Sequence, residues 1–241
     1  MKIIEKMAAK CRDHMHHESV TIAFLGDSVT QGCFEIFKKE NNAIETIFEQ
    51  KYSYERALSD ILATLYPLCP VNTLNAGISG DNSGNGLRRV ERDVLRHEPD
   101  LTVVCYGLND CGRSEGSVEK YTGNLRGIFE KVLASGSELI FMTPNMMNTK
   151  VSPHLTDPDF IELAKGTAYK QNEGFFDAHI DAARALCREM GVPVCDCYAI
   201  WKKLASSGVD TTELLSNKIN HPTRDMNKVF AYELVRTMFA E

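Results

Sequence analysis

The stretch VTIAFLGDSVTQG, residues 20–32, decides how the rest of the chain is interpreted. Its first six residues, Val20–Leu25, are a short continuous apolar run, which is typical of a strand buried on both faces of a parallel sheet. Ser28 follows at once, between Gly26 and Gly32, where a tight turn exposes a hydroxyl. Because ligands of open α/β sheets bind outside the carboxyl ends of the strands, this serine is placed for nucleophilic chemistry. The turn alone is equally consistent with a simple helix cap.

Four further short apolar runs predict strands, and longer amphipathic patterns between them predict helices. This βαβ series favours the α/β class with a parallel, doubly wound sheet. The five predicted strands are Val20–Leu25, Val71–Asn75, Leu101–Tyr106, Glu138–Thr143 and Val192–Asp196. The predicted helices are Tyr54–Leu65, Leu87–His97, Val118–Ala134, Glu173–Met190 and a last one from about Arg224 to Phe239.

The organisation of the chain predicts one domain. No internal repeat or low-complexity linker divides the 241 residues, so we expect a single domain over residues 1–241, with residues 1–18 as an N-terminal helical extension. Two segments, Cys33–Ser53 and Pro144–Asn172, are too long to be simple connections. Both leave the carboxyl ends of predicted strands, so we expect loops that overhang the crevice.

The composition is that of an ordinary soluble globular protein. Hydrophobic residues make up 43%, charged residues 25% and the net charge is -6, so neither nucleic acid nor an anionic membrane is expected as a partner. The chain has no signal-peptide pattern and no apolar run of membrane-spanning length.

The cysteines favour the cytoplasm. Eight of them without an export signal suggest free thiols in a reducing compartment. Cys195 and Cys197 alternate along a predicted strand end, so we expect them to point to opposite faces. A cluster near the N-terminus matches no common zinc spacing, and no metal is expected there: Cys11, His14, His16 and His17.

Three more polar turns are expected at the same sheet edge as Ser28. Gly77 follows the second strand, Asn109 follows the third, and His221 precedes the last helix. The set suits acyl transfer, with Ser28 attacking an ester carbonyl and His221 acting as general base. The N–H groups of Ser28 and Gly77 and the amide of Asn109 would stabilise the negative oxygen that develops.

Taken singly, each of these residues has an ordinary structural explanation. Gly77 suits a plain turn, Asn109-Asp110 suits a helix cap, and His221 suits a polar surface loop. Their occurrence together at strand ends favours a catalytic site. Asp27 and Asp110 are then expected to support the turns, Asp27 through hydrogen bonds to nearby backbone.

These motifs resemble the SGNH, or GDSL-type, hydrolases: Ser28 in GDSVTQG, Gly77 in NAGISGD, Asn109 in GLND and His221 in NHP. The resemblance extends from about Val20 to the last helix. It implies a flavodoxin-like three-layer α/β/α sandwich with a five-stranded parallel sheet of order 2-1-3-4-5. It also implies esterase, lipase or carbohydrate-deacetylase activity without a metal or organic cofactor.

The chain departs from the family pattern at Lys218, where the family usually has an aspartate three residues before the histidine. That aspartate holds the imidazole and stabilises the imidazolium, whereas a lysine facing the ring would disfavour it. We therefore expect Lys218→Asp to raise kcat on an activated acetyl ester; an unchanged or lower kcat in a folded variant would count against Lys218 occupying the orienting position.

Three arrangements remain open at this point. In the favoured one, Lys218 turns to solvent and a backbone carbonyl near Asn217 accepts the histidine N–H, which leaves a Ser–His dyad. In the second, a carboxylate from elsewhere substitutes. In the third, the site binds a ligand without cleaving it. The substitute carboxylates considered are Asp225, Glu213 and Asp210.

The sequence therefore predicts a cytoplasmic serine esterase acting on short acyl esters, with O-acetylated carbohydrate as the leading substrate. The alternative is a non-catalytic ligand-binding homologue. A nucleotide-binding module is not supported, since neither GxxxxGK[ST] nor a GxGxxG after a strand is present. A small-molecule or glycan ester is the expected partner, and nothing in the sequence indicates an oligomeric state.

Overall fold

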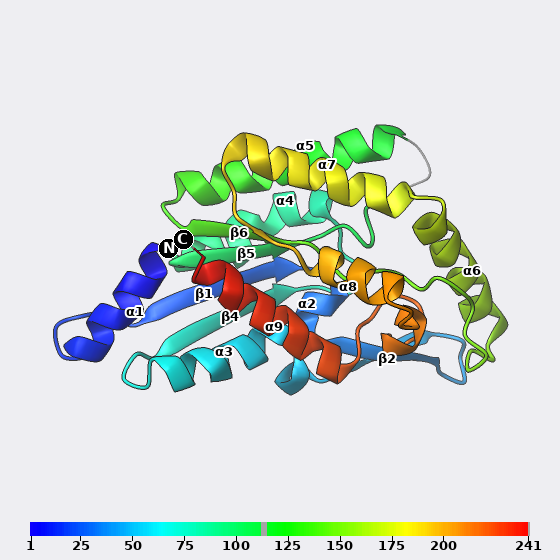
Figure 1. Cartoon of the computed structure of the whole chain (residues 1–241), viewed down its shortest axis with the longest axis horizontal. Helices are drawn as coiled ribbons and strands as arrows, with labels where there is room; N and C mark the ends of the chain where they lie inside the picture. The colour runs from blue at the N-terminus through cyan, green and yellow to red at the C-terminus, as the bar shows by residue number, and fades with distance from the viewer. Residues whose placement is uncertain (112–114, 241) are drawn as a thin grey trace.

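The computed structural model describes residues 1–111 and 115–240 and shows a parallel sheet between two layers of helices (Figure 1). The five strands pair in the order β4-β1-β5-β6-β7, and each neighbouring pair is parallel. Counted along the chain within this sheet, the order is 2-1-3-4-5, so the flavodoxin-like topology is confirmed. The strands are β1 (Val20–Gly26), β4 (Val71–Gly77), β5 (Leu101–Cys105), β6 (Glu138–Met142) and β7 (Val194–Cys195).

Alternate residues of β1 face the two helix layers, which explains its continuous apolar sequence. Val20, Ile22 and Phe24 belong to one hydrophobic cluster, whereas Ala23 and Leu25 belong to the other. One layer contains α4 (Ser83–Asp93), α5 (Glu115–Ala134) and α7 (Phe175–Met190). The other contains α1 (Lys2–Arg12), α3 (Tyr54–Leu65), α8 (Cys197–Ser206) and α9 (Arg224–Met238).

The N-terminal helix α1 is packed into the second of these layers. Its residues Ile3 and Met7 are buried in the same cluster as α3 and α9. The N–H groups of Lys2 and Ile3 donate to the carboxylate of Glu138, at 2.9 and 2.7 Å, so the start of β6 caps this helix. In the view of Figure 1 the start of α1 and the end of α9 both lie at this end of the sheet.

Both long segments contain regular structure, so the expectation that they are loops was wrong. Cys33–Ser53 holds an antiparallel hairpin of β2 (Cys33–Lys38) and β3 (Ile44–Phe48), followed by the short helix η1 (Gln50–Tyr52). Pro144–Asn172 holds helix α6 (Pro158–Asn172). Asp157 caps α6 and Pro158 occupies its first position, which is a helix start signal.

Two other boundaries differ from the sequence prediction. The expected helix Leu87–His97 begins earlier as α4, capped by Asn82, and ends in the short helix η2 (Leu95–His97). Strand β7 is shorter than expected because α8 begins at Cys197.

No helix within residues 1–111 and 115–240 is long and apolar enough to cross a bilayer.

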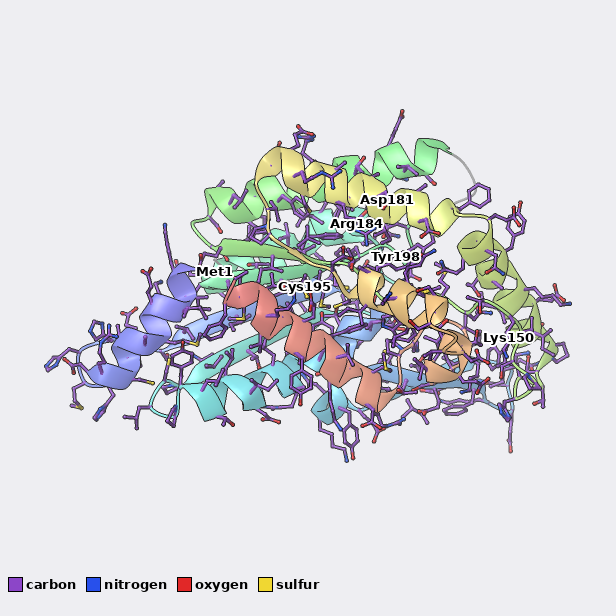
Figure 2. All side chains as sticks on the ribbon, viewed as in Figure 1. Met1, Lys150, Asp181, Arg184, Cys195 and Tyr198 are labelled. Atoms are coloured by element: carbon purple, nitrogen blue, oxygen red, sulfur yellow. The ribbon has the colours of Figure 1, made fainter. Side chains whose placement is uncertain are left out.

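The early start of α8 also corrects the expectation for its cysteines. The Sγ atoms of Cys195 and Cys197 lie 3.7 Å apart, because Cys197 is already helical and strand alternation does not apply to it. All eight cysteines are free thiols. Figure 2 labels Cys195 of β7 and Tyr198 of α8; the Tyr198 ring lies 5.8 Å from the guanidinium of Arg184.

Candidate active site

Ser28 lies at the carboxyl end of β1, as the first residue of the short helix α2 (Ser28–Gln31). Asp27 caps this helix through a 3.0 Å hydrogen bond from the Val29 N–H to its carboxylate, which is the supporting contact expected for it. Burial raises the pKa of Asp27 to about 7. Because the first N–H groups of a helix have no acceptor within it, the N–H of Ser28 is available to a ligand.

His221 faces Ser28 although the two residues are far apart in sequence. Its Nε2 lies 2.9 Å from Ser28 Oγ, and its Nδ1 lies 2.8 Å from the carbonyl oxygen of Phe34 in β2. A carbonyl only accepts, so Nδ1 carries the proton and Nε2 presents its lone pair to the hydroxyl. Burial lowers the pKa of His221, opposed by the Phe34 hydrogen bond and the charge of Glu35. The ring is therefore neutral at neutral pH and able to accept a proton.

The loop before His221 is held by Asn217, whose Oδ1 accepts from the N–H groups of Ile219, Asn220 and His221 at 2.9–3.0 Å. This arrangement places Lys218 on the outside of the turn. Lys218 has a φ of 59°, and its Nζ lies 2.8 Å from the Glu213 carboxylate, so it points away from the imidazole.

The acceptor of the histidine N–H differs from our expectation. It is a backbone carbonyl, as in the dyad arrangement, but it comes from Phe34 and not from the neighbourhood of Asn217. The three candidate carboxylates all pair with lysines instead. These pairs are Glu213 with Lys218 at 2.8 Å, Asp225 with Lys228 at 2.7 Å, and Asp210 with Lys150 at 2.5 Å.

Asn109 and Asp110 follow β5 and tie its turn to the start of α4. Asn109 is exposed, and one N–H of its amide donates to the carbonyl of Asp81 at 2.8 Å. The amide has a second N–H, which is engaged by no other described residue. Asp110 accepts from the N–H and hydroxyl of Ser83 at 2.9 and 2.5 Å, which fits a supporting role.

We expected Gly77 to allow a close approach to the substrate, whereas in the structure it allows a close approach to α2. Its N–H donates to Asn75 Oδ1 at 2.9 Å, so this donor is already in use. A Cβ atom on Gly77 would lie 2.3 Å from the Gln31 backbone nitrogen, so the close approach is to α2 and not to a substrate. Three residues on, Gly80 has a φ of 76° and open space at its Cβ position. The Gly80 N–H has no acceptor among the described residues.

A buried arginine that the sequence did not single out connects the turns that carry Ser28, Gly77 and Asn109. Arg89 of α4 donates to the carbonyl oxygens of Gly26 and Ala76, at 2.9 and 2.6 Å, and its Nε lies 2.7 Å from the Asp81 carboxylate. The carbonyl of Asp81 in turn holds Asn109. Arg89 is only 7% exposed, so it fixes the Ser28, Gly77 and Asn109 turns relative to one another. An arginine in a helical pattern gives no sequence signal of this role.

Comparison with known proteins identifies the family. The model of the GDSL-like Lipase/Acylhydrolase family matches residues 24–229, a range that contains Ser28, Gly77, Asn109 and His221. The chain belongs to this family.

Two esterases are similar to the chain in sequence. The chain is 23% identical over 167 residues to an acetylxylan esterase of Geobacillus stearothermophilus, covering 65% of this chain and 74% of that protein. It is 33% identical over 84 residues to an arylesterase of Vibrio mimicus, covering 35% of this chain and 39% of the arylesterase. The match thus spans about two fifths of the arylesterase.

Solved structures share the fold. The crystal structure of the Geobacillus acetylxylan esterase aligns with a TM-score of 0.67 at 19% identity, covering 93% of this chain and 96% of that one. A lipase/acylhydrolase from Enterococcus faecalis aligns with a TM-score of 0.64 at 20% identity, covering 90% and 94%.

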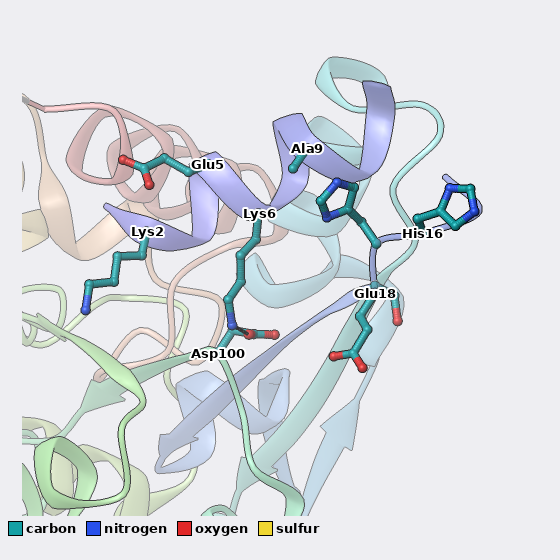
Figure 3. A pocket seen from close by; sticks show the side chains of 9 residues that line it. Lys2, Glu5, Lys6, Ala9, His16, Glu18 and Asp100 are labelled. Atoms are coloured by element: carbon teal, nitrogen blue, oxygen red, sulfur yellow. Dashed lines mark hydrogen bonds and ion pairs between the residues drawn. The ribbon is translucent and has the colours of Figure 1, made fainter. Parts of the chain in front are cut away.

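The surface hollows differ between the two ends of the sheet. A hollow of about 300 Å³ beside Gly77 is lined by Gln31, Phe48, Gln50 and Asn75. A larger one of about 630 Å³ lies at the amino ends of the strands, under α1, where Lys6 pairs with Asp100 (Figure 3). Because Ser28 follows the carboxyl end of β1, the larger hollow is not part of its site.

Proposed function

We propose that the protein is a serine ester hydrolase in which Ser28 is the nucleophile and His221 the general base. The observation that carries the proposal is the contact of 2.9 Å between Ser28 Oγ and His221 Nε2, with Phe34 on the other ring nitrogen. Membership of the GDSL-like family and the similarity to two esterases support carboxylic-ester hydrolysis as the reaction class.

The reaction proceeds in two halves. Ser28 Oγ attacks the ester carbonyl carbon while His221 Nε2 takes the hydroxyl proton, and the proton then passes to the leaving alcohol. Water attacks the acyl-serine with His221 again as base, which releases the acid and restores Ser28. The Phe34 carbonyl fixes the tautomer that this sequence needs, as the aspartate of a triad does. It carries no full charge of its own to stabilise the imidazolium.

The donors for the tetrahedral oxygen are proposed to be the Ser28 N–H, the second amide N–H of Asn109 and the Gly80 N–H. The Gly77 N–H suits this role less well than we expected, because it would first have to leave Asn75. Gly80 lies in the turn between Ser79, whose N–H donates to Gln31 Oε1, and Asp81, whose carbonyl holds Asn109. Removing one such donor typically costs roughly 10²–10³ in kcat.

Short acyl esters are the proposed substrates, with O-acetylated carbohydrate as the leading class. The small hollow beside Gly77 is not lined by Ser28, Asn109 or His221, but it lies at the same end of the sheet and contains one aromatic ring and the side chains of Gln31 and Gln50, which suits a sugar better than a long acyl chain. The acetylxylan esterase among the relatives supports the same class. The alternative of a non-catalytic binding homologue rests on Lys218 in place of the usual aspartate. The Phe34 carbonyl on His221 Nδ1 and the pairing of Lys218 with Glu213 support catalysis over this alternative.

Initial rates on nitrophenyl acetate, butyrate and octanoate, beside an O-acetylated xylooligosaccharide, test this proposal. We expect the highest kcat/KM on acetyl esters and a fall with acyl length. A folded protein that turns over none of these esters would overturn it.

A further inference from the structure

The carbonyl that orients His221 comes from an irregular point in the β2–β3 hairpin. This hairpin is a separate two-stranded sheet, and its register shifts between the pairs Cys33↔Phe48 and Ile36↔Thr46. Phe34 lies within the shift, where a bulge turns backbone groups away from the regular ladder. Strand pairing alone therefore does not fix the direction of the Phe34 carbonyl.

Arg224 binds the hairpin at this point from the other side of the site. It is the first residue of α9, three residues after His221. Its Nη1 and Nη2 donate to the two carboxylate oxygens of Glu35, at 2.7 and 2.9 Å, and its Nε donates to Glu49 at 2.6 Å. The guanidinium carbon also lies 4.4 Å from the centre of the Phe34 ring.

These contacts hold both strands of the hairpin at its open end. Glu35 adjoins Phe34 in β2, whereas Glu49 follows β3 and its N–H donates to the Gly32 carbonyl at 2.9 Å. A two-point contact between a guanidinium and a carboxylate restricts geometry more than a single ion pair does. Arg224 thus links the segment that carries His221 to the strand that carries its hydrogen-bond acceptor.

We propose that Arg224, clamped between Glu35 and Glu49, is the positioning residue that keeps the Phe34 carbonyl on His221 Nδ1, and that Glu35 supplies the negative charge the dyad otherwise lacks. This inference rests on the proposed esterase function. In this proposal the cluster of Arg224, Glu35 and Glu49 performs the two tasks of the family's aspartate, which are to orient the imidazole and to supply a negative charge.

The charges around His221 agree with this division of tasks. Glu35 raises the pKa of His221 and thereby favours the imidazolium. The other charged groups nearby are Arg224 and Glu49, which complete the cluster, and Asp27, which caps α2. Lys218 is turned to Glu213.

Three variants separate orientation from charge. Glu35→Gln removes the negative charge, so we expect a lower His221 pKa. We expect kcat on nitrophenyl acetate to fall about tenfold with little change in KM, which is the scale seen when residues that support functional histidines are replaced. Arg224→Gln should lower kcat similarly while raising that pKa, because Glu35 loses its cation. Arg224→Lys keeps the charge but not the two-point contact, so kcat should fall with little change in pKa.

The matched control is Asp225→Asn. Asp225 follows Arg224 directly in α9, and this substitution breaks its ion pair with Lys228. It should leave both kcat and the pKa unchanged. The pKa is measured by NMR titration of ¹⁵N-histidine-labelled protein, with the His221 signal assigned by its loss in His221→Asn.

The NMR measurement does not depend on turnover, so it distinguishes failure of this proposal from failure of the esterase function. If the protein proved inactive on esters, opposite pKa shifts in Glu35→Gln and Arg224→Gln would still support the cluster. The proposal is overturned if neither variant shifts the His221 pKa, or if Arg224→Lys keeps full kcat in an active enzyme.

Discussion

Ser28 with His221 and Ser117 with His179 make the same hydrogen-bond pattern in two regions of the molecule. The distances from Nε2 to Oγ are 2.9 and 3.2 Å. In both pairs Nδ1 lies 2.8 Å from a backbone carbonyl. Both imidazoles are buried, and both serines lie in the first turn of a helix.

The two pairs differ in where their partners originate. The carbonyl on His179 belongs to Phe175, four residues earlier in the same helix, and the ring packs on Tyr121 at 5.6 Å. The carbonyl that accepts from His221 belongs to Phe34, in a hairpin 187 residues away in sequence. Ser28 lies at the edge of the sheet that also carries Asn109. A serine–histidine hydrogen bond therefore does not by itself indicate catalysis. Our proposal of catalysis at Ser28 rests in addition on its place at the carboxyl ends of the strands and on membership of the GDSL-like family.

The largest expected difference between the pairs is in the serines. Ser28→Ala should lower kcat/KM on nitrophenyl acetate by roughly 10⁴-fold or more, because the nucleophile is lost. Ser117→Ala should stay within about twofold of the wild type. Equal losses in the two variants, in folded protein, would contradict the distinction.

A substitution of Asn109 tests whether hydrogen-bond donors at the sheet edge distinguish the Ser28 pair from the Ser117 pair. Asn109→Ala should lower kcat by roughly 10²–10³-fold with little change in KM, because its amide acts on the developing oxyanion. Asn172→Ala is the matched control, since Asn172 is also exposed and its amide also donates to a carbonyl, that of Thr149 at 2.9 Å. A rise in KM alone for Asn109→Ala would instead indicate ground-state binding.

The pH dependence should follow His221 and not His179. Because burial lowers the His221 pKa from its usual 6.5, kcat/KM should rise with pH through an inflection below 6.5 and then level off. Since the folded state disfavours the charged ring, stability should also decline as the pH falls through this range. His179→Gln should leave the inflection of the rate profile in place. An inflection above 6.5 would contradict the neutral, buried base.

The smallest effect is expected at Lys218. Its pairing with Glu213 argues against the sequence-based hypothesis. Lys218→Asp should therefore change kcat by less than about twofold, because it breaks a partly exposed ion pair that does not involve Ser28 or His221. Steady-state kinetics on nitrophenyl acetate checks this. A marked increase in kcat would show that an aspartate at this position does reach the ring.

The sequence predicted the sheet because its strands are buried on both faces and read as apolar runs. It also singled out Ser28, Asn109 and His221 as neighbours at one edge, since each follows a strand or precedes the last helix in a polar turn. The structure brings Ser28 and His221 into contact, and it places Asn109 after β5, the strand that pairs with β1.

The parts that were missed lack a side-chain signature. The acceptor for His221 is a main-chain carbonyl, which any residue at position 34 would provide, and it lies in a half-exposed hairpin. The role of Gly77 was misassigned because a glycine signals close approach without saying to what. The length of Pro144–Asn172 suggested a loop, although Asp157 and Pro158 begin a helix within it.

Labelling with a fluorophosphonate probe at neutral pH, followed by peptide mapping, tests most directly whether Ser28 is the activated serine. We expect an adduct on the Ser28 peptide that is retained in Ser117→Ala, weakened in His221→Ala and lost in Ser28→Ala. An adduct on Ser117, or no labelling of the folded wild-type protein, would contradict it.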